Sequence, residues 1–107
     1  MINRNAALTA LFEPATVAVV GASADATKTG GRPVAYLQSH GFGGEIWPIN
    51  PKATEIAGLK SFSSVADLPA APDAAIVLLG AERAHLAVRD LAQRGTKLAI
   101  VLASGFG

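Results

Sequence analysis

The chain has 107 residues, of which 50% are apolar and 16% charged, and its formal net charge is +1. This length allows one domain, and the near-neutral charge argues against a general role at nucleic acids or membrane surfaces. Cysteine is absent, which excludes disulfides, cysteine nucleophiles and cysteine-ligated metals. The N-terminus lacks the apolar core of a signal peptide, and no apolar run reaches the length of a membrane span. We therefore expect a cytoplasmic protein.

Strand-like and helix-like segments alternate along the chain. Buried β-branched runs ended by turn residues predict strands at residues 17–21, 45–49, 59–62, 74–79 and 98–102. Helices are expected at residues 5–12, 33–40 and 81–94, with one further turn starting at Ser64-Val65-Ala66-Asp67. Pro33 suits a first helical turn, and Gly41 and Gly95 suit helix ends.

The segment 81–94 has the clearest helical periodicity. Its apolar face is formed by residues at i, i+3, i+4, i+7 and i+8, namely Ala84, Ala87, Val88, Leu91 and Ala92. The charged residues Arg83, Arg89, Asp90 and Arg94 lie mostly away from this face. We expect these charges to form a solvated surface.

This alternation predicts an α/β fold, a three-layer Rossmann-like parallel sheet flanked by helices. The expected strand order is 3-2-1-4-5, with residues 59–62 at one edge. Residues 1–107 form one domain, and the chain stops just after a core strand. We therefore expect an N-terminal fragment of a larger multidomain protein.

The first strand ends in a small-residue loop that is typical of phosphate binding. Gly21-Ala22-Ser23 follows the strand, and the next helix starts near Gly31. Ser23 and Ala26 stand where a dinucleotide fingerprint, G-x-G-x-x-G, needs its second and third glycines. Backbone N–H groups, the Ser23 hydroxyl and the Lys28 ammonium still suit a phosphate.

The end of the second strand argues against NAD. A site for NAD places an acidic residue there to bind the ribose hydroxyls. This chain has Asn50-Pro51-Lys52 instead, so a carboxylate is missing and a cation is supplied. The pattern indicates a ligand with an additional phosphate near its ribose, and NADP and coenzyme A (CoA) both qualify.

An ordered set of short motifs resembles a known family. The set comprises Leu11-Phe12-Glu13-Pro14, residues 17–23, Gly41-Phe42-Gly43-Gly44, Pro48-Ile49-Asn50-Pro51-Lys52, Asp67-Leu68-Pro69, Pro72-Asp73 and Ser104-Gly105-Phe106-Gly107. In this order the motifs resemble the N-terminal CoA-binding domain of NDP-forming acyl-CoA synthetases, the relatives of succinyl-CoA synthetase that include ADP-forming acetate–CoA ligases. The resemblance covers nearly the whole chain.

The resemblance implies CoA as the cofactor and a role for each matching position. Gly21, Ala22 and Ser23 would line the phosphate loop, and Lys28 would reach the CoA phosphates. Asn50, Pro51 and Lys52 would lie beside the adenosine 3′-phosphate. Leu79 and Gly80 would border the adenine or pantetheine path, and Ser104 and Gly105 would lie toward the thiol.

The resemblance also implies what the fragment lacks. Neither His40 nor His85 matches the family's phosphohistidine motif, and ATP or ADP with Mg²⁺ would bind only in the parent's other domains. The fragment would therefore hold CoA, partner the remaining domains or subunits, and catalyse no ligation alone. The alternatives are a stand-alone CoA-binding or regulatory protein, a synthetase-like region fused to an acetyltransferase, and an NADP-binding oxidoreductase domain.

Simpler interpretations remain open for single residues. Lys28, Lys52 and Arg32 are equally consistent with solvated surface cations. Ser63 and Ser64 are most simply helix caps. No Ser-His-Asp set or metal-ligand spacing occurs, so neither hydrolase nor metal chemistry is expected.

Overall fold

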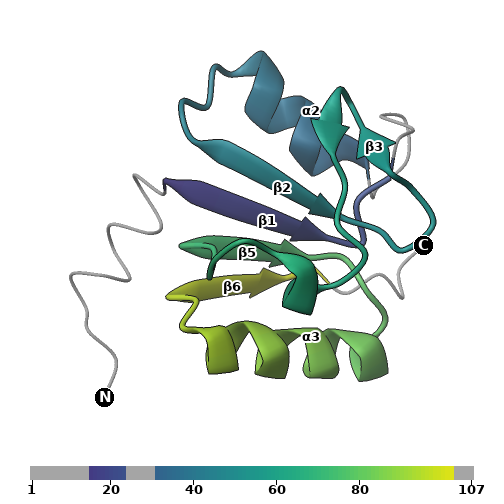
Figure 1. Cartoon of the computed structure of the whole chain (residues 1–107), viewed down its shortest axis with the longest axis vertical. Coiled ribbons are helices and arrows are strands. Elements are labelled where there is room, and N and C mark those ends of the chain that lie inside the picture. The colour runs from purple at the N-terminus through teal and green to yellow at the C-terminus, as the bar shows by residue number, and fades with distance from the viewer. Residues whose placement is uncertain (1–14, 24–30, 103–107) are drawn as a thin grey trace.

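The computed structural model describes residues 15–23 and 31–102. A four-stranded parallel sheet forms its centre, in the order β2-β1-β5-β6. The strands are β1 (Thr16–Val20), β2 (Glu45–Ile49), β5 (Ala74–Val77) and β6 (Leu98–Val101). Figure 1 shows the strands running in one direction, with α2 and α3 on either side. The α/β class and the relative order of these four strands are as predicted.

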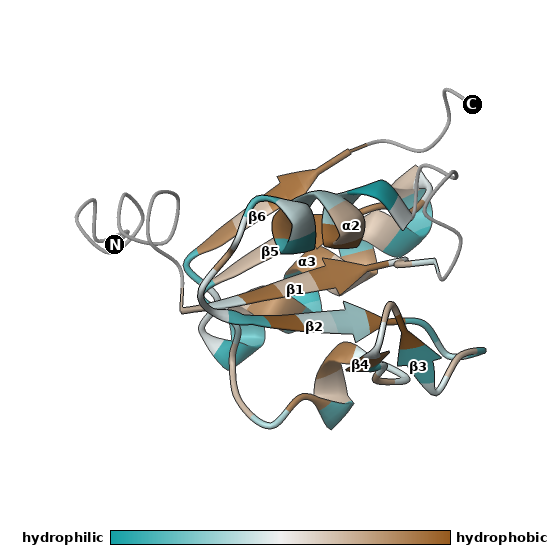
Figure 2. Ribbon diagram, turned by 90° about the horizontal axis from the view of Figure 1, so that it is seen from above, coloured by the Kyte–Doolittle hydropathy of each residue, from teal (hydrophilic) through white to brown (hydrophobic). Residues whose placement is uncertain are grey.

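Two helices and one short turn cover the sheet. The helices are α2 (Arg32–Ser39) and α3 (Ala81–Arg94), and the 3-10 turn is η2 (Val65–Asp67). Alternate side chains of β1 explain the layers: Ala18 and Val20 pack in one cluster with α3 and η2, whereas Val17 and Val19 pack in another with α2. This alternation follows from the two-residue period of a strand. Figure 2 shows the resulting hydrophobic β1 in the middle layer.

The edge segment predicted at residues 59–62 takes a different form. A small antiparallel hairpin pairs β3 (Glu55–Ile56) with β4 (Leu59–Lys60). The segment reaches the main sheet at Phe62, which forms a single parallel bridge to Ile49. It therefore lies beside β2 as expected, but it contributes a bridge in place of a full strand. The chain turns back at Gly58, whose φ of +81° suits a tight reversal.

The helices follow their sequence signals closely. The observed α3 has the predicted bounds, and it ends at Gly95 in the left-handed conformation. Gly41 and Phe42 close α2 with backbone bonds to the carbonyls of Gln38 and Leu37, the pattern of a Schellman motif. The helix expected at residues 5–12 lies outside the described residues.

Two expectations for α3 were wrong. Ala92 is exposed, so the buried face ends at Leu91. Arg94 is not a solvated charge, because its guanidinium donates to the carbonyls of Val65 and Leu68 at 2.7 and 2.9 Å. The long arginine side chain reaches across to η2 and ties that turn to the helix.

Within the described residues, neither helix has the length and apolarity that crossing a membrane would need.

Candidate functional site

A cavity of about 470 Å³ opens where the parallel strands end. Residues from the ends of β1, β2 and β5 line it together with η2 and one side of α3. The lining residues are Val20, Gly21, Ile49, Asn50, Pro51, Lys52, Ser63, Ser64, Val65, Leu78, Leu79, Arg83, Leu86, Ala87 and Asp90. Ligands of open parallel sheets bind at this edge.

The turn after β1 requires glycine. Gly21 has φ +87°, and a Cβ built there would lie 2.6 Å from the carbonyl oxygen of Leu78. The Gly21 N–H donates to the carbonyl of Ile49 at 3.0 Å. The strand end is thus drawn tightly against β2 and the chain after β5. This amide is therefore already engaged in the sheet, and the phosphate-loop role expected for Gly21 stays a prediction.

Asn50 joins two of the loops that form the cavity. Its side-chain amide donates to the carbonyl of Ala22 at 2.9 Å, and its side-chain oxygen accepts the Lys52 N–H at 2.8 Å. The backbone N–H of Asn50 donates to Phe62 at 2.9 Å. Asn50 therefore fixes the turn that carries Lys52 and holds it against the chain after β1.

Two exposed cations, Lys52 and Arg83, line the cavity from different elements. In the described part of the chain, the ion pair within 4 Å joins Arg89 to Asp90; Lys52 and Arg83 have no carboxylate partner there. Arg83 lies in the first turn of α3, whose N-cap Gly80 provides no side-chain cap. The positive end of the helix dipole therefore adds to these two charges.

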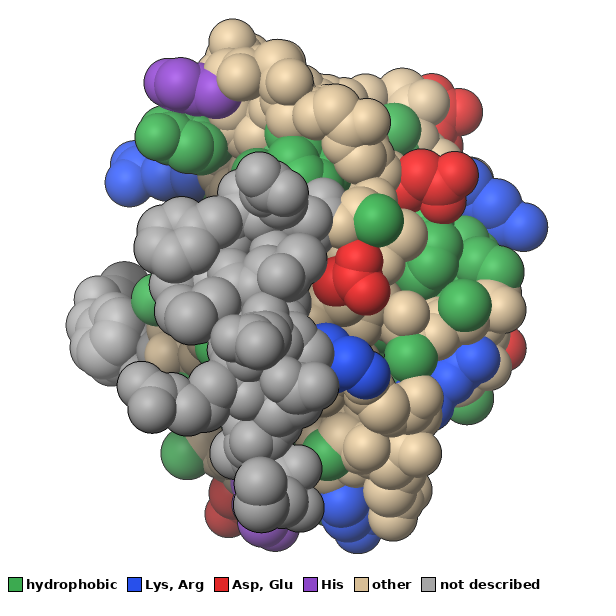
Figure 3. Space-filling model, turned by 90° about the vertical axis from the view of Figure 1, so that its left-hand side faces the viewer, with side chains coloured by type: hydrophobic (Ala, Val, Ile, Leu, Met, Phe, Trp, Pro, Cys, Tyr) green, Lys and Arg blue, Asp and Glu red, His purple; other side chains and the backbone are tan. Residues whose placement is uncertain are grey.

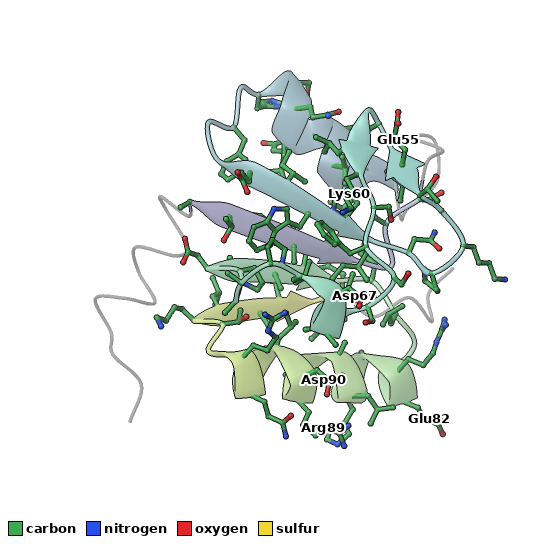
Figure 4. All side chains as sticks on the ribbon, viewed as in Figure 1. Glu55, Lys60, Asp67, Glu82, Arg89 and Asp90 are labelled. Atoms are coloured by element: carbon green, nitrogen blue, oxygen red, sulfur yellow. The ribbon has the colours of Figure 1, made fainter. Side chains whose placement is uncertain are left out.

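The remaining wall combines hydroxyls, apolar surface and one carboxylate. Ser63 and Ser64 come from the chain before η2, and Leu79 and Leu86 provide hydrocarbon. Ser64 is the N-cap of η2, and its hydroxyl donates to the Asp67 carboxylate at 3.3 Å. Figure 4 shows Asp67 on η2 and Asp90 on α3, whereas Glu82 and Arg89 project away from the sheet. The cavity thus offers cations for an anion and apolar surface for a ring.

At the opposite edge, where the strands begin, the described residues carry charges of both signs (Figure 3). Figure 3 shows acidic and basic side chains interspersed over the described part of that face. Among the described residues, no three His, Asp or Glu side chains come together as a metal site would require.

Residues 15–106 match the family described as CoA binding domain. The chain belongs to this family. It is 41% identical over 96 residues to ADP-forming acetate–CoA ligase II of Archaeoglobus fulgidus, covering 90% of this chain and 14% of the relative. It is 36% identical over 104 residues to the alpha subunit of the ADP-forming acetate–CoA ligase I of Pyrococcus furiosus, covering 94% and 22%. The CoA-binding domain thus spans less than a quarter of these curated relatives.

Solved structures agree with this assignment. An acetyl-coenzyme A synthetase 1 of Ca. Korarchaeum cryptofilum, in complex with phosphate and ADP, superposes with a TM-score of 0.84 at 40% identity. The match covers 92% of this chain and 21% of that one. A conserved hypothetical protein from Pyrococcus furiosus gives a TM-score of 0.73 at 31% identity, covering 81% and 73%. The comparisons therefore confirm the resemblance to the CoA-binding domain that the sequence motifs indicated.

The CoA-binding domain brings together five of the predicted site residues. Gly21, Asn50, Pro51, Lys52 and Leu79 line the cavity. Ala22 and Gly80 each adjoin a lining residue in the chain, Ser23 lies two residues after Gly21, and none of these three is part of the lining itself. Lys28, Ser104 and Gly105 lie outside the described residues, so their roles stay predictions.

Sequence reasoning missed four polar residues of the cavity. Ser63 and Ser64 were interpreted as caps, and Arg83 and Asp90 as part of a solvated face, yet all four line the cavity. The available signal was Arg83, which follows the end of a central strand by six residues. A cation in the first turn of such a helix lies near the ligand-binding edge of the sheet.

Proposed function

We propose that this CoA-binding domain holds coenzyme A by its phosphorylated nucleotide, in the cavity at the ends of β1, β2 and β5. The observation that carries the proposal is the concentration of two unpaired cations at this edge, beside apolar surface. CoA has a 3′-phosphate, a 5′-diphosphate and an adenine ring, so its chemistry fits cations next to hydrocarbon.

Asn50 and Lys52 favour CoA over NAD. The ribose of a dinucleotide lies near the end of the second strand, where a carboxylate binds its hydroxyls. The side chain of Asn50 is occupied with the carbonyl of Ala22 and the N–H of Lys52, and it carries no charge. Lys52 instead places an ammonium beside the ribose position. We assign the 3′-phosphate of CoA to Lys52.

The names of the relatives support a proposal for the activity of the whole protein. We propose that the domain belongs to an ADP-forming acyl-CoA synthetase, which catalyses acyl-CoA + ADP + phosphate ⇌ acid + CoA + ATP. The domain's own residues bind and orient CoA, while ADP, phosphate and Mg²⁺ bind to other domains or subunits. The naming of two relatives as acetate–CoA ligases supports this reaction class.

A separate CoA-binding protein is the second candidate. The Pyrococcus furiosus structure supports it, because this chain covers 73% of that protein, which leaves little room there for a further domain that binds ATP or ADP. Both candidates use the same CoA site and differ in their partners. Adding the remaining synthetase domains or subunits and assaying ATP formation from acetyl-CoA, ADP and phosphate separates them, since only the first candidate predicts activity.

Calorimetric titration of the full chain tests the CoA site. We expect CoA to bind more tightly than dephospho-CoA, NADP or NAD, because only CoA presents both a 3′-phosphate and a diphosphate with one adenosine. Equal affinity for CoA and NAD would contradict the role assigned to Lys52, and no binding of CoA would contradict the function.

A further inference from the structure

Arg83 occupies a distinctive place on the cavity wall. It is the third residue of α3, and it lines the same cavity as Lys52 without a carboxylate partner among the described residues. Leu86 and Asp90 follow on the same wall, three and seven residues later. Seven residues of helix span about 10 Å, so Arg83 lies at the strand-end part of this wall, and Asp90, which pairs with Arg89, lies farther along α3.

Lys52 and Arg83 approach the cavity from opposite sides of β1. Lys52 follows β2, Arg83 follows β5, and β1 lies between these two strands. Adjacent strands are about 4.8 Å apart, so the two cations arise from strands separated by about 10 Å. Two cations placed in this way suit two separate anionic groups of one ligand better than a single phosphate.

We propose that Arg83 binds the 5′-diphosphate of CoA while Lys52 binds the 3′-phosphate, an assignment that rests on the proposed function. The ribose end of the ligand belongs beside β2, which leaves the diphosphate for the side of the turn after β1 that faces β5. The guanidinium of Arg83 is suited to two phosphate oxygens at once. The start of α3 contributes its dipole to the same group.

Titration of the full chain with CoA and dephospho-CoA tests this assignment. Arg83→Gln should weaken both ligands by the same factor, about fivefold, the size of one exposed ionic contact. Lys52→Gln should weaken CoA alone, and so lower the ratio of the two affinities. Arg83→Lys should recover part of the loss, because it restores charge without the planar fork. Lys97→Gln is the matched control, since Lys97 is exposed at the start of β6, where the strands begin.

The outcomes distinguish the inference from the proposed function. If the unaltered chain does not bind CoA, the function is wrong and the assignment falls with it. If the unaltered chain binds CoA, and Arg83→Gln binds both ligands as tightly as the Lys97→Gln control, then the assignment of the diphosphate to Arg83 is wrong. The proposed function would stand in that case. A loss confined to CoA would instead place Arg83 at the 3′-phosphate and overturn the assignment to the diphosphate. Thermal unfolding of each variant confirms that the fold is retained, as expected for an exposed side chain.

Discussion

Replacing Asn50 tests how strongly one side chain holds the site together. Asn50→Ala removes the bond to the Ala22 carbonyl and the bond from the Lys52 N–H. Each such bond contributes about 1 kcal/mol net, so we expect a loss of about 2 kcal/mol in the free energy of unfolding. For a domain of this size, that loss corresponds to a fall in Tm of about 8–16 °C.

Urea denaturation followed by circular dichroism measures this loss. Gln38→Ala is the matched control, because Gln38 also donates a side-chain amide bond to a backbone carbonyl, that of Ala57, at 3.0 Å. That bond is a single exposed one on α2 and lies outside the cavity, so its removal should cost about 0.5 kcal/mol. If Asn50→Ala costs no more than Gln38→Ala, the two bonds of Asn50 contribute nothing beyond an ordinary surface contact and our reasoning is refuted.

Asn50→Asp separates the geometry of the turn from its charge. The carboxylate keeps an acceptor for the Lys52 N–H, but it places an oxygen against the Ala22 carbonyl, which the amide now contacts at 2.9 Å. We expect a loss of stability together with weaker CoA binding than in Asn50→Ala, because the new negative charge faces the ligand's phosphates. Binding by Asn50→Asp equal to that of Asn50→Ala would show that Asn50 lies too far from the phosphates to affect them.

Two further stability predictions use controls from within the chain. Gly21→Ala should cost about 1 kcal/mol more than Gly58→Ala in urea denaturation: both glycines have similar positive φ values, but only Gly21 would place its Cβ within 3 Å of a carbonyl oxygen. Equal costs would mean that the chain at Leu78 shifts freely. Arg94→Ala should lower the free energy of unfolding by about 2 kcal/mol, because it removes two hydrogen bonds from a charged donor. Arg89→Ala is the control: it removes only an exposed ion pair and should cost under about 0.5 kcal/mol. Similar losses would show that η2 does not depend on the guanidinium.

Much of the fold could be predicted because its signals are local and periodic. The bounds of α3 follow from its apolar repeat and from Gly95, and both agree with the structure. The order of the four long strands follows from parallel strands joined by helical connections. The site edge then follows as well, since the carboxyl ends of parallel strands meet on one side. This is why Gly21, Asn50 and Lys52 share a cavity as expected.

The segment after β2 was harder to predict because its pairing depends on a turn. Residues 59–62 read as one strand, yet Gly58 folds Leu59 and Lys60 back on Glu55 and Ile56. Only Phe62 then remains in register with Ile49. A short apolar run does not reveal which of two neighbours its backbone will pair with. The internal bonds of Asn50 escaped prediction for a similar reason, since they depend on how closely the chain after β1 approaches.

The cavity wall of α3 shows where helical periodicity stops being informative. Ala84, Ala87 and Leu91 mark the face of α3 against the sheet. From the apolar repeat alone, the remaining positions of the helix are predicted to face solvent. Arg94 draws η2 onto α3 through two carbonyls, so the neighbouring row of the helix, from Arg83 to Asp90, gains a facing wall. That row becomes lining only because a turn some 18 residues earlier in the chain folds against it. Whether a charged residue on the flank of a helix is solvated or lines a cavity therefore depends on whether a distant segment packs beside that flank. Here η2 packs beside α3, and Arg83 lines the cavity at the strand ends.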